Sequence, residues 1–204
     1  LGSNVVVGII GELREHKGQE DFIRVAALVA KKYKDVKEMM MKEQYALAYP
    51  LTKELKKAYP DNTVSDHAYL NEDVNFFYVV CELKLMQDVA SEDAEQYIHD
   101  INNEPRRQML SFHLGHYYFL KDEYAKAIEA FDRAGYDNLS NEEIADAKYE
   151  KGYSYFNLKQ FDKAKPLFSE IVQIPKNKYF IPANYYYGFI AYSDRQYSEA
   201  LKSF

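Results

Sequence analysis

The sequence predicts an all-α fold in which helix-turn-helix repeats stack into an α-solenoid. The prediction rests on three sets of residues that recur at steps of 37 and 36 positions and keep fixed internal offsets. In each set an alanine follows a glycine by 12 residues, and a phenylalanine follows the alanine by 4. The sets are Gly115, Ala127 and Phe131; Gly152, Ala164 and Phe168; and Gly188, Ala200 and Phe204. A fixed period of this length indicates an architecture built by stacking one unit.

Each set fits a pair of amphipathic helices. Residues four apart lie on the same side of a helix, so the alanine and the phenylalanine place a small and a large apolar group on one face. The glycine lies on the preceding helix, as in residues 112–120. There the missing side chain permits close backbone contact, although glycine costs about 1 kcal/mol relative to alanine in a helix. Each unit is therefore predicted to be a helical hairpin.

Short polar segments separate the two helices of each predicted hairpin, at residues 121–123, 159–160 and 194–196. Ser140 is followed three residues later by Glu143, the spacing of a capping box, which satisfies free amide groups at a helix start. The sequence therefore predicts that a new hairpin begins directly after Ser140.

These residues resemble the tetratricopeptide repeat, whose first helix carries Leu-Gly-x2-Tyr and whose second helix carries Ala-x3-Phe. Leu114, Gly115 and Tyr118 match the first part, and the resemblance covers residues 109–204. The Trp position of the repeat is taken by Ser111, Lys148 and Asn184. The resemblance implies a right-handed α-solenoid that binds a protein or a peptide, without enzymatic activity or a cofactor. Similar bacterial repeat proteins often work in the cell envelope, so the resemblance makes the periplasm one candidate compartment. The cytoplasm is the alternative.

Two further hairpins are predicted upstream by weaker matches. Ala94 and Ile98 occupy the alanine and phenylalanine positions of one, and the segment 45–48 parallels 124–127 in the other. In the earlier unit Thr52 replaces the phenylalanine, and Pro60 falls at the expected end of the repeat. We therefore expect four to five hairpins over residues 38–204. The last of them is truncated, because residue 204 falls inside a second helix, and we expect the native protein to continue with further repeats.

Residues 1–37 do not fit the repeat and predict a separate strand-helix extension. Residues 5–11 are a β-branched run suited to a strand, and a helix is expected from about Gln19 to Lys34. This segment resembles the first strand and loop of the nucleotide-sugar half of GT-B-fold glycosyltransferases, in which Lys17-Gly18 matches and Glu12 stands at the Arg position. Alternatively, the strand packs on the first hairpin, pairs its edge with another chain in self-association, or belongs to a composite chain.

Composition narrows the classes of function. The net charge of −6 argues against a nucleic-acid partner, and no apolar run reaches the length of a membrane span, so a soluble chain is expected. Cys81, the only cysteine, lies in an apolar run and is predicted to be a core residue rather than a nucleophile. His113 and His116 lack the companions of a metal site, and no phosphate-binding loop or nucleophile-base pair is found. We predict neither catalytic residues nor a metal.

The phased aromatic residues are the candidate binding site. Taking the first-helix geometry that the resemblance implies, a set of mostly aromatic side chains faces the concave side of the solenoid. They are Phe112, His116 and Phe119 in one unit; Tyr149, Tyr153 and Phe156 in the next; and Tyr185, Phe189 and Tyr192 in the last. Such rings bury large areas at little cost in side-chain entropy. Two interpretations stay open: the rings line a peptide-binding groove, or they pack against neighbouring units or against further repeats that follow in the native protein.

The leading functional hypothesis is thus a protein-protein interaction scaffold that holds a protein or an extended peptide in an aromatic groove. The alternatives are a remnant of a nucleotide-sugar glycosyltransferase with a donor site near Lys17, and a purely structural or self-associating repeat module.

Overall fold

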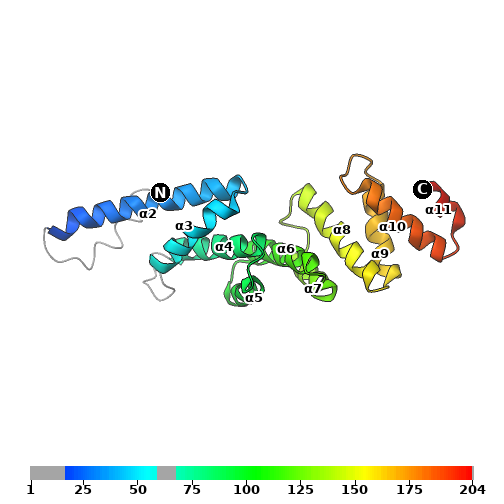
Figure 1. Ribbon diagram of the computed structural model, residues 1–204, viewed down its shortest axis with the longest axis horizontal. Helices are drawn as coiled ribbons and strands as arrows, with labels where there is room; N and C mark the ends of the chain where they lie inside the picture. The colour runs from blue at the N-terminus through cyan, green and yellow to red at the C-terminus, as the bar shows by residue number, and fades with distance from the viewer. Residues whose placement is uncertain (1–16, 59–67, 204) are drawn as a thin grey trace. The chain divides into compact units, whose positions relative to one another are not determined.

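The computed structural model describes residues 17–58 and 68–203 of the chain, and in these ranges all regular secondary structure is helical. The all-α prediction is confirmed for this part of the chain. The helices are α2 (Lys17–Met41), α3 (Tyr45–Ala58), α4 (Ala68–Lys84), α5 (Ala90–Asp100), α6 (Glu104–Leu120), α7 (Tyr124–Ala134), α8 (Asn141–Asn157), α9 (Phe161–Val172), α10 (Phe180–Ser193) and α11 (Tyr197–Ser203) (Figure 1). The predicted strand at residues 5–11 lies outside the described residues, as do Pro60 and Phe204.

One turn geometry joins the helices of every pair from α2–α3 to α10–α11. Each turn holds one non-glycine residue in the left-handed region, with φ between 54° and 61°. The next amide donates to the carbonyl five residues earlier, as from Glu123 to Tyr118 at 2.9 Å and from Gln160 to Tyr155 at 2.9 Å. This hydrogen bond satisfies a carbonyl that the end of the first helix would otherwise leave free. The left-handed residues are Glu43, Met86, Asp122, Lys159 and Arg195.

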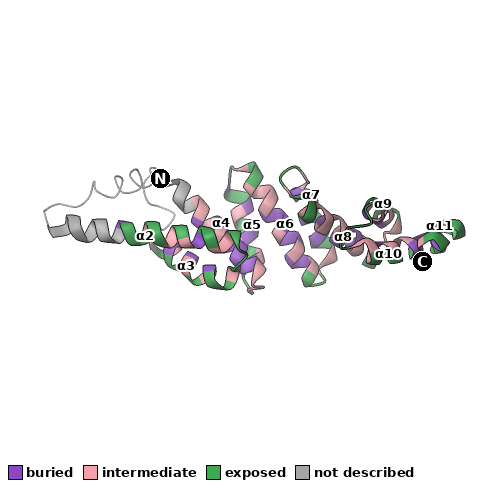
Figure 2. Cartoon of the chain, turned by 90° about the horizontal axis from the view of Figure 1, so that it is seen from above, coloured by how far each residue is buried: buried purple, intermediate pink, exposed green. Residues whose placement is uncertain are grey.

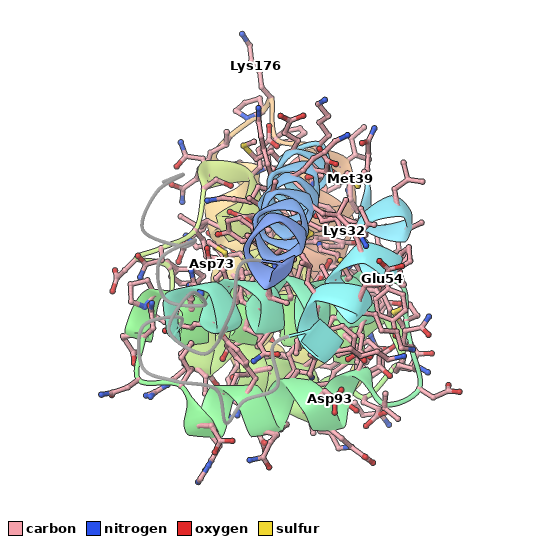
Figure 3. The ribbon with its side chains drawn as sticks, turned by 90° about the vertical axis from the view of Figure 1, so that its left-hand side faces the viewer. Lys32, Met39, Glu54, Asp73, Asp93 and Lys176 are labelled. Atoms are coloured by element: carbon pink, nitrogen blue, oxygen red, sulfur yellow. The ribbon has the colours of Figure 1, made fainter. Side chains whose placement is uncertain are left out.

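By its contacts the chain divides into two compact units, residues 1–93 and 94–204. In the first unit α2 packs on α3, and Val36, Leu55 and Val74 form a buried core between α2, α3 and α4. Lys32 pairs with Glu54 across α2 and α3, and Figure 3 shows the two side chains next to each other. The helix expected from Gln19 to Lys34 is present as part of α2, which runs on to Met41. It passes residue 37, where the sequence predicts a boundary between the extension and the repeats, and that boundary stays a prediction.

In the second unit successive hairpins stack, with contacts between α6 and α8, α7 and α8, and α9 and α10. The glycine of each hairpin lies against the phenylalanine of the same hairpin at the two positions described. A Cβ placed on Gly115 would lie 2.7 Å from Cδ1 of Phe131, and a Cβ on Gly152 would lie 3.2 Å from Cε1 of Phe168. The paired helices therefore approach too closely at these positions to leave ordinary room for a side chain.

The capping box at the start of α8 is confirmed. The Ser140 side chain accepts from the Glu143 amide, and the Glu143 carboxylate accepts from the Ser140 amide. The repeat positions are buried in every described hairpin, including Ala94 and Ile98 on α5 and Ala48 on α3. Thr52 is also fully buried, and its hydroxyl donates to the Tyr49 carbonyl at 2.7 Å. Figure 2 shows buried residues recurring along the helices between exposed ones, the pattern that the periodicity predicts.

Candidate functional site

The three candidate residues on α6 are engaged in packing, one within its own hairpin and two with the hairpin that follows. Phe112 is only 4% exposed, and its ring lies 6.2 Å from that of Phe131 inside its own hairpin. His116 places Nδ1 2.8 Å from the Oε1 of Glu150, a buried carboxylate on α8. Phe119 presents its ring to Tyr153 on α8, with centroids 5.6 Å apart. The last two residues thus connect α6 to α8.

The three candidates on α8 are also engaged in packing. Tyr149 stacks on Tyr179 with centroids 4.1 Å apart and planes 6° from parallel, and burial raises the pKa of its hydroxyl. Tyr153 and Phe156 are half-buried, and both contact Tyr186 on α10, at 5.3 and 4.9 Å. On α8 the aromatic positions therefore form the joint between two hairpins.

One arrangement of three rings occurs twice in the second unit. We call the aromatic ring directly after a repeat glycine the knob. The slot is the pair of rings that lie four and nine residues after the repeat glycine of the preceding hairpin. Tyr153 is the first knob, 5.6 Å from Phe119 and 6.1 Å from Tyr124. The second knob repeats this geometry, with Phe189 lying 5.4 Å from Phe156 and 6.4 Å from Phe161.

Tyr186 is the residue that the sequence analysis missed. Its ring lies within 6.5 Å of those of Tyr149, Tyr153, Phe156, Phe168 and Tyr185. Burial among them raises the pKa of its hydroxyl to about 12. It stands two residues before Gly188, the place that Glu150 holds before Gly152. That shared offset was the signal available in the sequence.

The candidates on α10 differ from the others because they are open to solvent. Tyr185, Phe189 and Tyr192 are 56%, 41% and 62% exposed. Tyr192 lies 5.6 Å from Tyr197 on α11, which is 55% exposed. These two rings are four and nine residues after Gly188, so they form a third slot, and in the part of the chain that the structure describes no knob enters it. We call Tyr185, Phe189, Tyr192 and Tyr197 the aromatic face.

The aromatic face is not interrupted by charge along α10. The fourteen residues of this helix, Phe180–Ser193, include no Asp, Glu, Lys or Arg. Ile181 on the same helix is 79% exposed, and Leu201 on α11 is 79% exposed. Exposed apolar side chains gathered in this way make the aromatic face a candidate contact surface.

Apart from the aromatic face, a hollow lies between the start of α8 and the end of α9, with a volume of about 820 Å³. Ile144, Ile171 and Ile174 supply apolar lining, and Lys148, Lys176 and Lys178 are among the polar lining residues. Lys148 pairs with Glu170 at 2.5 Å and Lys178 with Asp146 at 2.6 Å, so two of these three cations are already matched.

Two buried ionisable groups lie in the first unit. Cys81 is fully buried with Sγ 3.5 Å from the Met40 sulfur, and burial raises its thiol pKa to about 12, which confirms the predicted core role. Glu82 is also fully buried, and it accepts a hydrogen bond of 3.1 Å from the Tyr49 hydroxyl. Burial, and next the nearby carboxyl of Asp93, raise the pKa of Glu82.

The described residues contain no group of three or more His, Cys, Asp or Glu side chains placed to hold a metal ion. None of the helices from α2 to α11, over the residues described, combines the length and apolar character needed to cross a membrane.

Comparison with known proteins agrees with the geometry of the hairpins. The tetratricopeptide repeat family matches residues 145–178, which include most of α8 and all of α9. No curated protein matches the sequence. The resemblance of residues 4–37 to glycosyltransferases receives no support from these comparisons.

Among solved structures, a mutant of MamA is 17% identical, with 87% of this chain and 94% of that chain covered and a TM-score of 0.66. A crystal structure of MamA is 22% identical, with 83% and 90% covered and a TM-score of 0.59. At this level of identity the likeness concerns the fold. Residues 145–178 are thus a tetratricopeptide repeat, and the chain has an all-helical repeat fold similar to that of MamA.

Proposed function

We propose that the chain is a non-catalytic scaffold that binds another protein or an extended peptide, and that the aromatic face of α10 and α11 is its contact surface. The observation that carries the proposal is that Tyr185, Tyr192 and Tyr197 are more than half exposed beside Phe189, on a helix pair whose first member has no Asp, Glu, Lys or Arg. The tetratricopeptide repeat at residues 145–178 supports the interaction class, because repeats of this kind serve as binding surfaces.

The chemistry of the aromatic face suits a protein partner. Tyrosine and phenylalanine are enriched at the buried centres of interfaces, where a few large side chains carry most of the binding energy. Each ring contributes a large contact area and loses little rotamer freedom, because it has only two side-chain torsions. The tyrosine hydroxyls can stay hydrated while the rings are covered. An uncharged helix face also spares the partner the cost of desolvating ions.

The nine candidate residues then divide by role. Phe112, His116, Phe119, Tyr149, Tyr153 and Phe156 hold the hairpins together, and Tyr185 and Tyr192 contact the partner. Phe189 does both, because it packs on Phe156 and Phe161 and is still 41% exposed. The two interpretations left open by the sequence, packing and binding, are in this proposal assigned to different repeats of the same pattern.

A peptide library displayed on phage tests the proposal with the full chain as the target. Selection should enrich ligands whose affinity falls about tenfold or more for Tyr192→Ala, the loss expected when a central aromatic contact is removed. Ile174→Ala is the matched control, because Ile174 is similarly exposed at 55% but lies in the loop after α9. Ligands that bind Tyr192→Ala as tightly as the unaltered chain would contradict the assignment of the contact surface.

A further inference from the structure

Glu82 stands at a position that glycine holds in the later hairpins. It precedes Ala94 by 12 residues, the offset that the three repeat glycines keep from their alanines. At Gly115 and Gly152 the structure leaves no ordinary room for a side chain, whereas here the chain places a carboxyl group that is fully buried. Burying an ionised carboxylate is costly unless its oxygens find donors or a counter-ion, so the partners of Glu82 decide its charge.

The partners of Glu82 satisfy only one of its two oxygens. The Tyr49 hydroxyl donates to Oε1 at 3.1 Å, and Oε2 is buried without a hydrogen-bond donor among the described residues. Two lysines of α3 point to rings of the same cluster. Lys53 lies over Tyr49 and Lys56 over Tyr78, with Nζ 5.5 and 4.3 Å from the ring centroids. Within the part of the chain that the structure describes, Oε2 thus has neither a donor nor a counter-ion.

A second carboxyl group faces Glu82. Asp93 lies in the first turn of α5 (Figure 3) and is within hydrogen-bonding reach of the Glu82 side chain. Two charged carboxylates repel each other so close together, and neither has a proton to donate. With one proton between them, the contact becomes an O–H···O hydrogen bond to a charged acceptor, which belongs to the stronger class of hydrogen bonds. Burial, and to a smaller extent Asp93, raise the pKa of Glu82, so Glu82 is the member of the pair that keeps the proton.

The remaining titratable groups of the cluster do not compete for this proton. Tyr49 on α3 and Tyr78 on α4 stack with centroids 5.6 Å apart, and burial raises the pKa of both hydroxyls. Burial also raises the pKa of the Cys81 thiol to about 12. All three groups keep their own protons in the neutral range, in which Glu82 and Asp93 form the pair that can change its charge.

We propose that Glu82 and Asp93 share one proton, and that this proton is a pH-sensitive latch on the turn between α4 and α5. Backbone hydrogen bonds tie the same turn, from the Gln87 amide to the Glu82 carbonyl at 3.0 Å and from the Asp93 amide to the Val89 carbonyl at 3.1 Å. The latch stabilises the turn fully below the ordinary pKa of glutamic acid, about 4.5, and its effect is lost as pH rises through the raised pKa of the folded chain. Segment 85–93 then opens more readily, because two buried carboxylates repel each other. This regulation goes beyond the proposed function and does not depend on it.

Hydrogen exchange of the Gln87 and Asp93 amides, followed by NMR on the full chain, tests the latch. After correction for the intrinsic pH dependence of exchange, we expect the protection of both amides to fall about tenfold or more between pH 5 and pH 8. The reason is that each unit by which folding raises a pKa changes the opening equilibrium about tenfold. In Glu82→Gln the new side-chain amide donates to Asp93 at every pH, so the fall should disappear.

Asp93→Asn is the variant that separates a shared proton from simple burial of Glu82. Its amide can donate to the Glu82 carboxylate, so the fall in protection should disappear here too. Asp88→Asn is the matched control, because Asp88 is an exposed acid of the same turn, and it should keep the full fall. An unchanged fall in Asp93→Asn would overturn the proposal. So would a gain of protection from millimolar magnesium at pH 8 that Asp93→Asn abolishes, because the bridge would then be a metal ion.

Infrared spectroscopy of the unaltered chain supplies a test that needs no substitution to fold. A band from a protonated carboxyl group should persist at pH 6, where exposed carboxyl groups are ionised, and should fade as the pH is raised further. Absence of this band at pH 6 would show that Glu82 and Asp93 are both charged, which refutes the shared proton.

Discussion

Gly115 and Gly152 occupy the same repeat position but differ in the space around them, which allows a matched test of the close helix approach. Both lie within first helices and both are buried. A Cβ on Gly115 would lie 2.7 and 2.8 Å from Cδ1 and Cε1 of Phe131, distances that real side chains do not tolerate. A Cβ on Gly152 would lie 3.2 Å from the nearest atom, on Phe168, so a shift of a few tenths of an ångström would restore ordinary contact.

The expected magnitudes follow from two opposing terms. Replacing glycine by alanine inside a helix gains about 1 kcal/mol at either position. At Gly115 the ring of Phe131 is buried and must move, and such overpacking costs about 1–3 kcal/mol. We therefore expect Gly115→Ala to lower the free energy of unfolding by up to about 2 kcal/mol, and Gly152→Ala to change it by less than about 1 kcal/mol in either direction.

Urea denaturation followed by far-ultraviolet circular dichroism measures both variants under one set of conditions. Phe131→Leu combined with Gly115→Ala should recover part of the loss, because the smaller side chain makes room for the added methyl group. If Gly152→Ala proves as destabilising as Gly115→Ala, or if Phe131→Leu and Gly115→Ala are strictly additive, the close approach of α6 and α7 at this position is not the cause.

Three further predictions concern charge and backbone geometry. Because burial raises the pKa of Glu82, the folded chain holds this proton more tightly than the unfolded chain, so the free energy of unfolding should fall as pH rises above about 4.5; Glu82→Gln should flatten that slope in urea titrations across pH. His116→Ala leaves the buried Glu150 carboxylate without its partner and should cost about 1.5–3 kcal/mol in the same assay, a loss that a simultaneous Glu150→Ala should reduce. Lys159→Gly should raise the melting temperature, because it removes the strain of a non-glycine residue in the left-handed region, roughly 1 kcal/mol. Glu129→Gly, at an exposed position of the helix α7, should lower the melting temperature.

The repeat itself could be predicted from the sequence because its determinants are residue types at fixed spacing. Gly115 and Gly152 had to be small where helices touch, and the side chains of Ser140 and Glu143 carry the cap directly. The start of the first hairpin was harder to predict from the sequence. Residues 17–41 form one continuous helix, but β-branched residues upstream and the glycine at position 18 favoured a separate extension.

The partition of the aromatic residues could not be predicted, because the same pattern is covered in one hairpin and open in another. Tyr149 and Tyr185 are equivalent by spacing, yet the first stacks on Tyr179 and the second is 56% exposed. Tyr149 is covered by Tyr179, which precedes α10, and the local sequence around Tyr149 does not specify that contact. Tyr186 was overlooked because its importance comes from several rings meeting in space.

The turns between paired helices place a different constraint on how such a chain can vary. Their geometry is maintained by amide and carbonyl groups, and the left-handed position holds an acid, a thioether and bases in different hairpins. The identity of the residue at each tip is therefore largely uncoupled from the folding of the hairpin that carries it. Mutations can accumulate at the tips, and new surface properties can arise there, while the helices behind them keep their positions.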